Sequence, residues 1–220
     1  AWDVLDGRKL WVQQRPGDPL TLLQSGVLGA WKDTLVAGQG ARLAGFDPTR
    51  GTLRWEATVA SPRGANEVER LADLVGPAAR VGDTICARGF QAAVGCVDAA
   101  RGAARWSRPV SGVTGIAADQ DFVFAADSSS RIQAWKLGSG EPVWNSERLL
   151  NRGLSAPLVV GRTLVFGDAG GLLHFLDRSN GQPLLRLPTD GRPITAAPLH
   201  IGTTLVVVTQ GGGVFAFRPE

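Results

Sequence analysis

A turn pattern that recurs along the chain constrains the fold more than any other feature of the sequence. Its clearest copy has an apolar residue and an aspartate at Phe46-Asp47, a glycine four positions later at Gly51 and a tryptophan four positions after that, at Trp55. Aspartate accepts hydrogen bonds from backbone amides just ahead of it, and glycine adopts backbone angles that other residues resist. The pattern therefore predicts a tight turn between antiparallel strands, with a tryptophan that packs on the neighbouring unit.

The pattern recurs at a nearly constant spacing, which indicates a repeat protein. Its other copies are Trp2-Asp3 to Trp11, Val97-Asp98 to Trp106, and the degraded Trp135-Lys136 to Trp144, Leu176-Asp177 to Leu185 and Phe217-Arg218. Successive aspartates, or the residues in their place, are separated by 44, 51, 38, 41 and 41 residues. Periods near 40 residues are typical of helical repeats and of four-stranded propeller blades.

The strand content distinguishes between these two architectures. Residues 122–124, 164–166 and 205–208 are short β-rich runs bounded by Gly, Asp and Ser. No stretch shows a sustained apolar period of 3.6 residues, which a helical repeat requires. The sequence therefore predicts an all-β fold: a β-propeller of four-stranded antiparallel blades, with about five blades in this chain.

The repeats also predict where the blades lie. Residues 60–76 form an insertion between the first two blades. The expected strands, blade by blade, are 27–31, 34–38, 42–46 and 53–59; 77–81, 84–88, 93–97 and 104–108; 113–117, 122–126, 132–135 and 142–145; 156–160, 164–167, 172–176 and 183–187; and 197–201, 205–210 and 213–217. The last blade lacks a fourth strand, and residues 10–14 form a spare one. We therefore expect residues 10–14 to complete the last blade if the ring closes.

Composition excludes several classes of protein. The net charge is +3, and the basic residues are scattered along the 220-residue chain, so nucleic-acid binding is not favoured. No run of 18 apolar residues predicts a membrane-spanning helix. The chain begins inside a repeat without a secretory signal pattern, which is typical of a mature chain or a fragment.

Two cysteines and two histidines are the obvious candidates for chemistry. Cys86 and Cys96 fall on the two middle strands of one predicted blade, equidistant from a turn near Gln91, so a disulfide and a pair of buried thiols are both open interpretations. Metal binding is not favoured, because four ligands are not in sight. His174 and His200 lie in predicted strands without a partner motif, and no motif of a serine hydrolase, zinc protease or nucleotide-binding loop occurs.

The turn pattern resembles that of the PQQ-like propeller repeats, and two loops resemble one branch of that superfamily. The segment Glu67-Val68-Glu69-Arg70-Leu71-Ala72-Asp73 is similar to a segment of the BamB family, and Leu20-Thr21-Leu22-Leu23 is similar to its Leu-Ser-Leu-Arg loop. The closing Gly-Gly-Val-Phe-Ala-Phe also fits that family. Leu23 stands where the family usually has arginine, and Val75 stands where a second acidic residue is usual.

The resemblance implies a scaffold of the β-barrel assembly machinery that is not an enzyme and has no cofactor. Its implied partners are the POTRA domains of BamA and unfolded outer-membrane protein strands, with no nucleic acid. Its implied location is the periplasmic face of the outer membrane, reached through a lipid anchor whose cysteine is not in this chain. Residues 1–220 then form a single propeller domain or about five blades of an eight-bladed propeller.

Two other functions remain open from the residues. One is a fragment of a quinone-dependent dehydrogenase, although the chain lacks the adjacent cysteines typical of those enzymes. The other is a general peptide-binding propeller that accepts extended strands along its sheet edges.

Strand order predicts the partner-binding site. In a four-stranded meander, the fourth-to-first connections emerge on the face opposite the tryptophan turns. We therefore expect two loops side by side there: an apolar patch and a charged rim, made by Leu20, Leu22 and Leu23 and by Glu67, Glu69, Arg70 and Asp73. The alternative is that the leucines fold under the blade as core.

Overall fold

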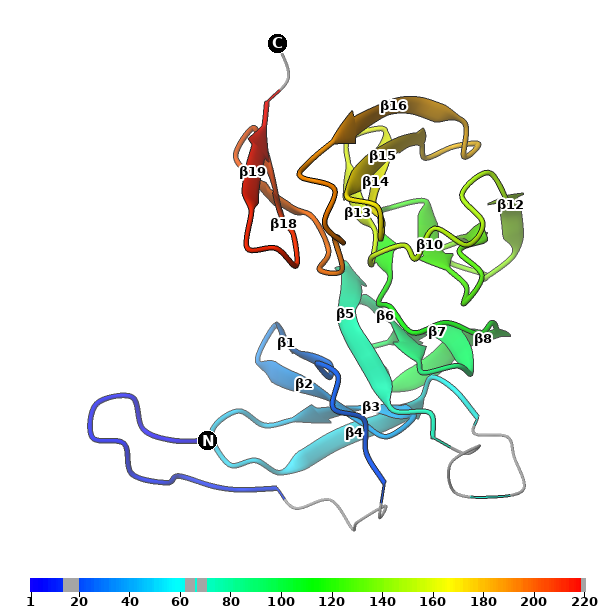
Figure 1. Ribbon diagram of the computed structural model, residues 1–220. Coiled ribbons are helices and arrows are strands. Elements are labelled where there is room, and N and C mark those ends of the chain that lie inside the picture. Colours follow the sequence, from blue (N-terminus) through cyan, green and yellow to red (C-terminus); the bar gives the residue numbers. More distant parts are fainter. Residues whose placement is uncertain (14–19, 62–65, 67–70, 219–220) are drawn as a thin grey trace.

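The computed structural model describes residues 1–13, 20–61, 66 and 71–218, and within these ranges it contains strands and no helix (Figure 1). Five antiparallel sheets follow one another along the chain, each with its strands in sequence order. The structure thus confirms the predicted all-β propeller blades.

The strands agree closely with the predicted blades. Their bounds are β1 Leu28–Trp31, β2 Thr34–Gln39, β3 Arg42–Phe46 and β4 Leu53–Thr58; β5 Leu74–Val81, β6 Thr84–Gly89, β7 Ala93–Asp98 and β8 Ala103–Pro109; β9 Ala117–Ala118, β10 Phe122–Ala126, β11 Ile132–Lys136 and β12 Pro142–Ser146; β13 Leu158–Val160, β14 Thr163–Gly167, β15 Leu172–Asp177 and β16 Pro183–Pro188; and β17 Leu199–Ile201, β18 Thr204–Val208 and β19 Val214–Phe217. The main differences are a longer β5 and a very short β9.

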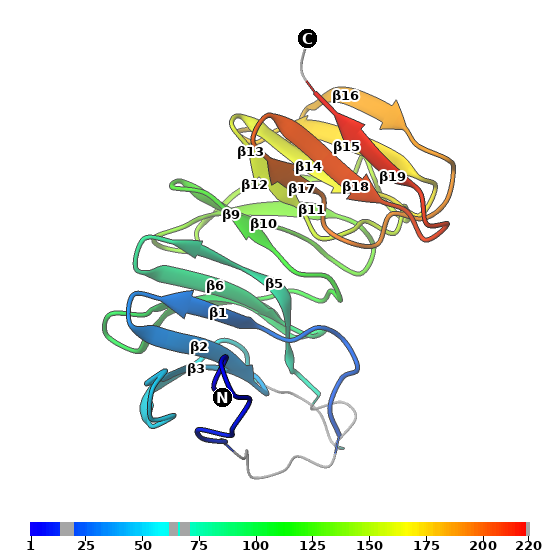
Figure 2. The same ribbon diagram turned by 90° about the vertical axis from the view of Figure 1, so that its left-hand side faces the viewer.

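The blades fan around a common axis as an open arc. The first strand of each blade lies nearest the axis, and β9 contacts both β5 and β13. The sheet of β1–β4 and the sheet of β17–β19 stand at the two ends of the arc, with the open side between them (Figures 1 and 2). Each hydrophobic cluster joins neighbouring blades: one combines Leu43 with Ile85, and another combines Leu164 with Phe124. The core is therefore a series of layers between blades.

The N-terminal segment does not complete the last blade, because the described blades form an open arc and the ring closure on which that expectation depended does not occur. The last sheet has three strands, and residues 1–13 lie against the first blade instead. There the Trp11 indole N–H donates to the Pro48 carbonyl at 3.0 Å. The Asp3 N–H donates to the Arg8 carbonyl at 2.8 Å, so the segment is itself a turn of the repeated kind. Its tryptophan packs on the turn that follows in sequence, and this contact holds the segment at the opposite end of the arc.

Every complete copy of the pattern makes the same contact between blades. The Trp55 side chain covers Gly102 of the next blade so closely that a Cβ added at Gly102 would lie 2.3 Å from the Trp55 Cβ. Trp106 covers Gly140 in the same way, and its indole N–H donates to the Leu137 carbonyl at 2.8 Å. The predicted packing of these tryptophans between blades is confirmed. Glycine at these positions satisfies a positive φ, 62° at Gly102, and also leaves room for the ring.

Cys86 on β6 lies directly opposite Cys96 on β7, and the structure pairs them in a disulfide. Both residues are buried in the layer between the second and third blades, beside Val94 and Trp106. The bond would close a loop of about 11 residues, worth about 2–3 kcal/mol if it constrains the unfolded chain.

We expect Trp106→Ala to lower the free energy of unfolding by about 3–5 kcal/mol, because it removes a large aromatic ring from a layer between blades. Denaturant unfolding measures this. Trp2→Ala is the matched control, since Trp2 is 68% exposed, and it should change stability by less than about 0.5 kcal/mol. Equal effects of the two variants would contradict the assigned role of Trp106.

Thiol titration tests the disulfide. Unfolded, unreduced protein should show no reactive thiol, and reduction should release two, because these are the only two cysteines. Two reactive thiols before reduction would mean that Cys86 and Cys96 are free core residues.

Candidate partner-binding site

The described parts of the two loops that the sequence predicts as one surface lie close together, at Leu22 and Asp73. They precede β1 and β5, and so belong to the entries of the first two blades. The Leu22 N–H donates to the Asp73 carboxylate at 3.0 Å, and the Gly76 N–H donates to the Ser25 carbonyl at 2.9 Å. The Leu74 N–H also donates to the Gly40 carbonyl at 2.9 Å, which anchors the second loop on the first blade. The entries of neighbouring blades are therefore joined by hydrogen bonds.

The leucines of the first loop differ in exposure. Leu23 is fully exposed and Leu20 is 41% exposed, whereas Leu22 is half-buried. Leu20 and Leu23 thus do not form part of the core. Exposed leucines in a connection, where polar residues are usual, mark an interaction site when they form a patch.

Asp73 has a second role besides carrying charge. Its side chain is half-buried, and it accepts the hydrogen bond from the Leu22 backbone. Its own carbonyl accepts a hydrogen bond from the Phe90 N–H at 2.9 Å. Asp73 therefore links the leucine loop to the second blade. Glu67, Glu69 and Arg70, the other charged residues predicted for this surface, lie outside the described residues.

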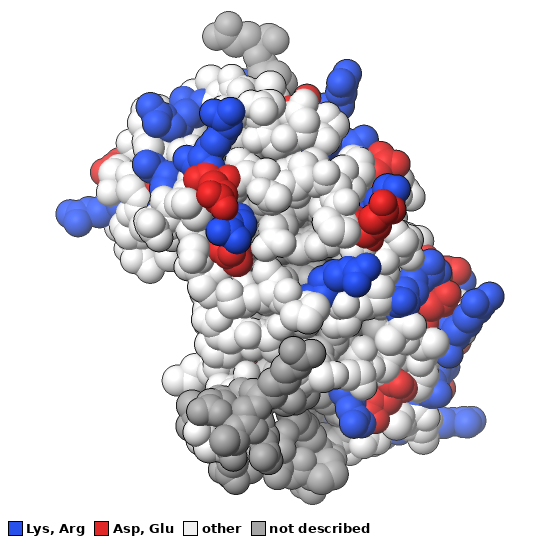
Figure 3. All heavy atoms as spheres, turned by 90° about the vertical axis from the view of Figure 1, so that its right-hand side faces the viewer, with Lys and Arg blue, Asp and Glu red and all other residues white. Residues whose placement is uncertain are grey.

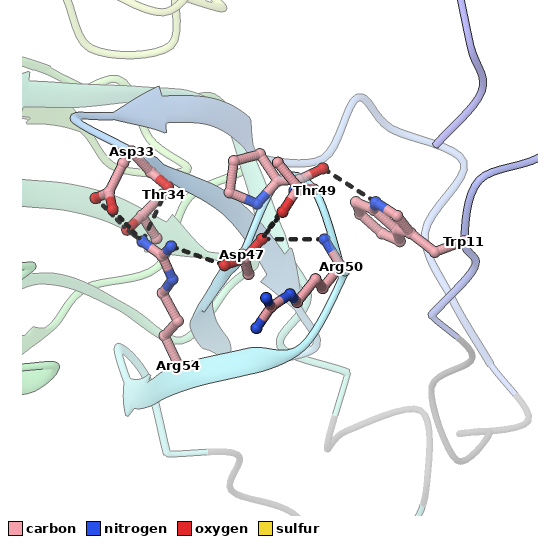
Figure 4. A network of polar contacts seen from close by, with 8 residues as sticks. Trp11, Asp33, Thr34, Asp47, Thr49, Arg50 and Arg54 are labelled. Carbon is pink, nitrogen blue, oxygen red and sulfur yellow. Dashed lines mark hydrogen bonds and ion pairs between the residues drawn. The ribbon is translucent and has the colours of Figure 1, made fainter.

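The opposite face carries the tryptophan turns, and Figure 4 shows a network of polar contacts at the turns of the first blade. Asp47 accepts hydrogen bonds from the Thr49 hydroxyl at 2.6 Å and from the Arg54 guanidinium at 2.9 Å, and these bonds hold the pKa of Asp47 well below its usual range. Arg54 also pairs with Asp33 at 2.9 Å. These networks tie the two turns of one blade together.

A buried ionic cluster in the fourth blade was not predicted from the sequence. Asp168, in the turn after β14, is fully buried and lies 2.8 Å from His174 Nε2 and 2.6 Å from Arg152 Nε. Burial alone would raise the pKa of Asp168, but the hydrogen bonds from His174, the Leu172 amide and Arg152 outweigh it, so the pKa is lowered. The cluster is satisfied internally and fastens the connection before β13 to the blade. The one signal in the sequence was that the third blade also has an aspartate, Asp127, at the turn position that Asp168 occupies in the fourth.

The described residues carry no sign of a metal site or of a membrane-spanning helix. No group of three or more His, Cys, Asp and Glu side chains among them is placed to hold a metal ion. Within the same ranges, no helix has the length and hydropathy needed to cross a membrane. Basic and acidic side chains are interleaved on the face that Figure 3 shows, without a large patch of one sign.

Comparison with known proteins identifies the family. The family model described as outer membrane protein assembly factor BamB matches residues 1–146 and 139–220, which together span the chain. The chain belongs to the BamB family.

Individual relatives agree with this assignment. The chain is 37% identical over 222 residues to the BamB of Burkholderia pseudomallei and 34% identical over 220 residues to that of Bordetella pertussis. These alignments cover 100% and 99% of the chain but only 58% and 57% of the two relatives. The crystal structure of BamB from Moraxella catarrhalis matches 99% of the chain and covers 65% of that protein, with a TM-score of 0.89 at 22% identity. The chain therefore shares the BamB propeller fold and spans less than two thirds of each relative's length.

We expect Asp73→Ala to free the leucine loop. Amide hydrogen exchange at Leu22 should become about tenfold faster, because the variant lacks the carboxylate that accepts this N–H. Asp73→Asn keeps an acceptor oxygen and should preserve most of the protection. The Gly38 amide, which donates to the Val27 carbonyl, serves as the internal control. Unchanged exchange at Leu22 in Asp73→Ala would contradict the positioning role.

Proposed function

We propose that this chain is the docking part of an outer membrane protein assembly factor, a non-catalytic scaffold that binds the POTRA domains of BamA. The observation that carries the proposal is the joined pair of loops on the face opposite the tryptophan turns, with Leu20 and Leu23 exposed. Membership of the BamB family supports the role in assembly. Binding would hold the partner in place for the folding and insertion of outer-membrane proteins.

The surface suits a protein partner for a physical reason. Its centre would be the exposed leucines, whose burial in a complex removes apolar area from water. Its rim would include Asp73 and the charged side chains of residues 67, 69 and 70, which set register and accelerate association. Leu22 is half-buried in the free protein, so it supports the loop and offers less new contact area than Leu23.

The intact protein would be larger than this chain. The coverage of the relatives suggests that about five blades here belong to a propeller of about eight, anchored by a lipid at the periplasmic face of the outer membrane. Family membership favours this interpretation over a quinone-dependent dehydrogenase. Adding quinone and calcium and assaying alcohol oxidation separates the two functions, since a scaffold gives no turnover.

We expect Leu23→Glu and Leu20→Glu each to weaken binding to isolated BamA POTRA domains by about tenfold or more, because each places a charge in an apolar contact. Surface plasmon resonance with the immobilised POTRA domains measures the affinity. Both residues are exposed, so thermal unfolding should stay nearly unchanged.

Leu184→Glu is the matched control. Leu184 is 57% exposed and lies on β16, the fourth strand of a different blade. The Leu184→Glu variant should bind the POTRA domains with the affinity of the unaltered protein. If Leu23→Glu and Leu184→Glu have equal affinities, the leucine loop is not the docking surface.

A further inference from the structure

A recess lies at the end of the blades opposite the leucine loop, where the first-to-second strand turns of three blades meet. It has a volume of about 510 Å³. The first blade contributes Trp31 and Lys32, the second contributes Arg80 and Asp83, and the third contributes the turn at 118–120. These turns share a face with the tryptophan turns, so the recess is remote from the leucine loop.

Two residues of this recess, Trp31 and Lys32, depart from the repeat. At the first-to-second strand turn, three blades place a glycine with positive φ: Gly82 at 56°, Gly161 at 58° and Gly202 at 61°. The first blade instead has Lys32, held at a φ of 49°. Left-handed backbone is unfavourable for lysine, and such strain gathers at functional sites. The residue before it is also unusual, because Trp31 stands where those blades have Val81, Val160 and Ile201.

Among the described residues, the carboxylates near the recess pair with Lys32 and Arg178 but not with Arg80. Lys32 Nζ lies 4.4 Å from the Trp31 ring centroid and 3.2 Å from an Asp83 oxygen, so it is already paired. Asp119 is held by Arg178 at 2.7 Å. Arg80 donates to the Ala30 carbonyl at 3.1 Å, and no carboxylate of the described residues lies within ion-pair distance of it. The remaining guanidinium N–H groups of this exposed side chain are available to an anion.

A narrower groove of about 180 Å³ shares Arg80 with the recess and runs between β1 and β5. Small residues line much of it, among them Gly29, Ala30, Ala78 and Ala79. Small side chains allow close approach of another backbone. An extended peptide can therefore lie in the groove while its carboxylate reaches Arg80.

We propose that this recess binds a carboxylate of an extended peptide, with Arg80 as the charged anchor and Lys32 as the second cation. Guanidinium binds carboxylate through paired N–H bonds. The side chains of Asp83 and Asp119 disfavour a dianion such as phosphate more than a monoanionic carboxylate, which favours a peptide ligand. The Gln120 amide would supply a neutral hydrogen bond at the mouth. This site goes beyond the proposed docking surface and does not depend on it.

Fluorescence polarisation with the whole chain tests the proposal. The probe is an N-terminally labelled Gly-Ala-Val-Ala-Gly-Ala peptide with a free C-terminal carboxylate, compared with its C-terminal amide and with an amide carrying one internal aspartate. The free acid, the aspartate peptide or both should bind at least about tenfold more tightly than the neutral amide. Which of the two binds more tightly identifies the source of the carboxylate. Equal affinities for the three peptides would overturn the proposal, and so would an equal affinity for inorganic phosphate.

Variants separate recognition from folding. Arg80→Gln should weaken binding of the tightest peptide by about tenfold or more. Lys32→Gly restores the residue that three other blades use, so it should weaken binding while leaving the melting temperature unchanged or higher. Arg162→Gln alters the same turn of the fourth blade, outside the recess, and should bind normally. Wild-type affinity in both Arg80→Gln and Lys32→Gly would also overturn the proposal.

Discussion

The contact between a tryptophan and the glycine of the following turn is the interaction on which this fold depends. It repeats from Trp11 on Gly51 to Trp144 on Gly181. Each contact needs both partners, since a side chain at the glycine would collide with the ring. Each also joins one repeat to the next, so the array is held by nearest-neighbour contacts, as in other repeat proteins. The open arc therefore has a separate apolar layer at each junction between blades.

The meander of each blade divides the molecule into two faces with different properties. The turns that carry the tryptophan motif are short, and polar networks such as Asp47 with Arg54 hold them in place. The opposite face carries the longer fourth-to-first connections, which are free to vary without disturbing the junctions. The two loops of the proposed docking surface are connections of this kind. The proposed docking surface is thus placed where the repeat constrains sequence least.

The recess at Arg80 differs from the proposed docking surface in its position on the blades. It lies on the constrained face, and two of its residues, Trp31 and Lys32, replace those that the repeat otherwise uses. Lys32 keeps the left-handed backbone of the turn, so the fold is preserved while a cation and an aromatic ring are added. A repeat protein offers this comparison internally, because sister blades show what the fold alone requires.

The sequence by itself determined the blade architecture, the tryptophan packing and the proximity of the leucine loop to Asp73. These follow from local turn chemistry and from the strand order of a meander, both of which are visible in residue spacing. The tertiary structure decided the position of residues 1–13. The sequence allows this segment to pair with the last blade or to pack on the first, and only the contact of Trp11 with Gly51 places it on the first. It also decided that Asp73 holds the Leu22 backbone, since that bond depends on the conformation of two loops 51 residues apart. Two further features could not be predicted from the sequence: the cluster of Asp168, His174 and Arg152, and the recess at Arg80. Each brings together side chains that become neighbours only when the blades pack.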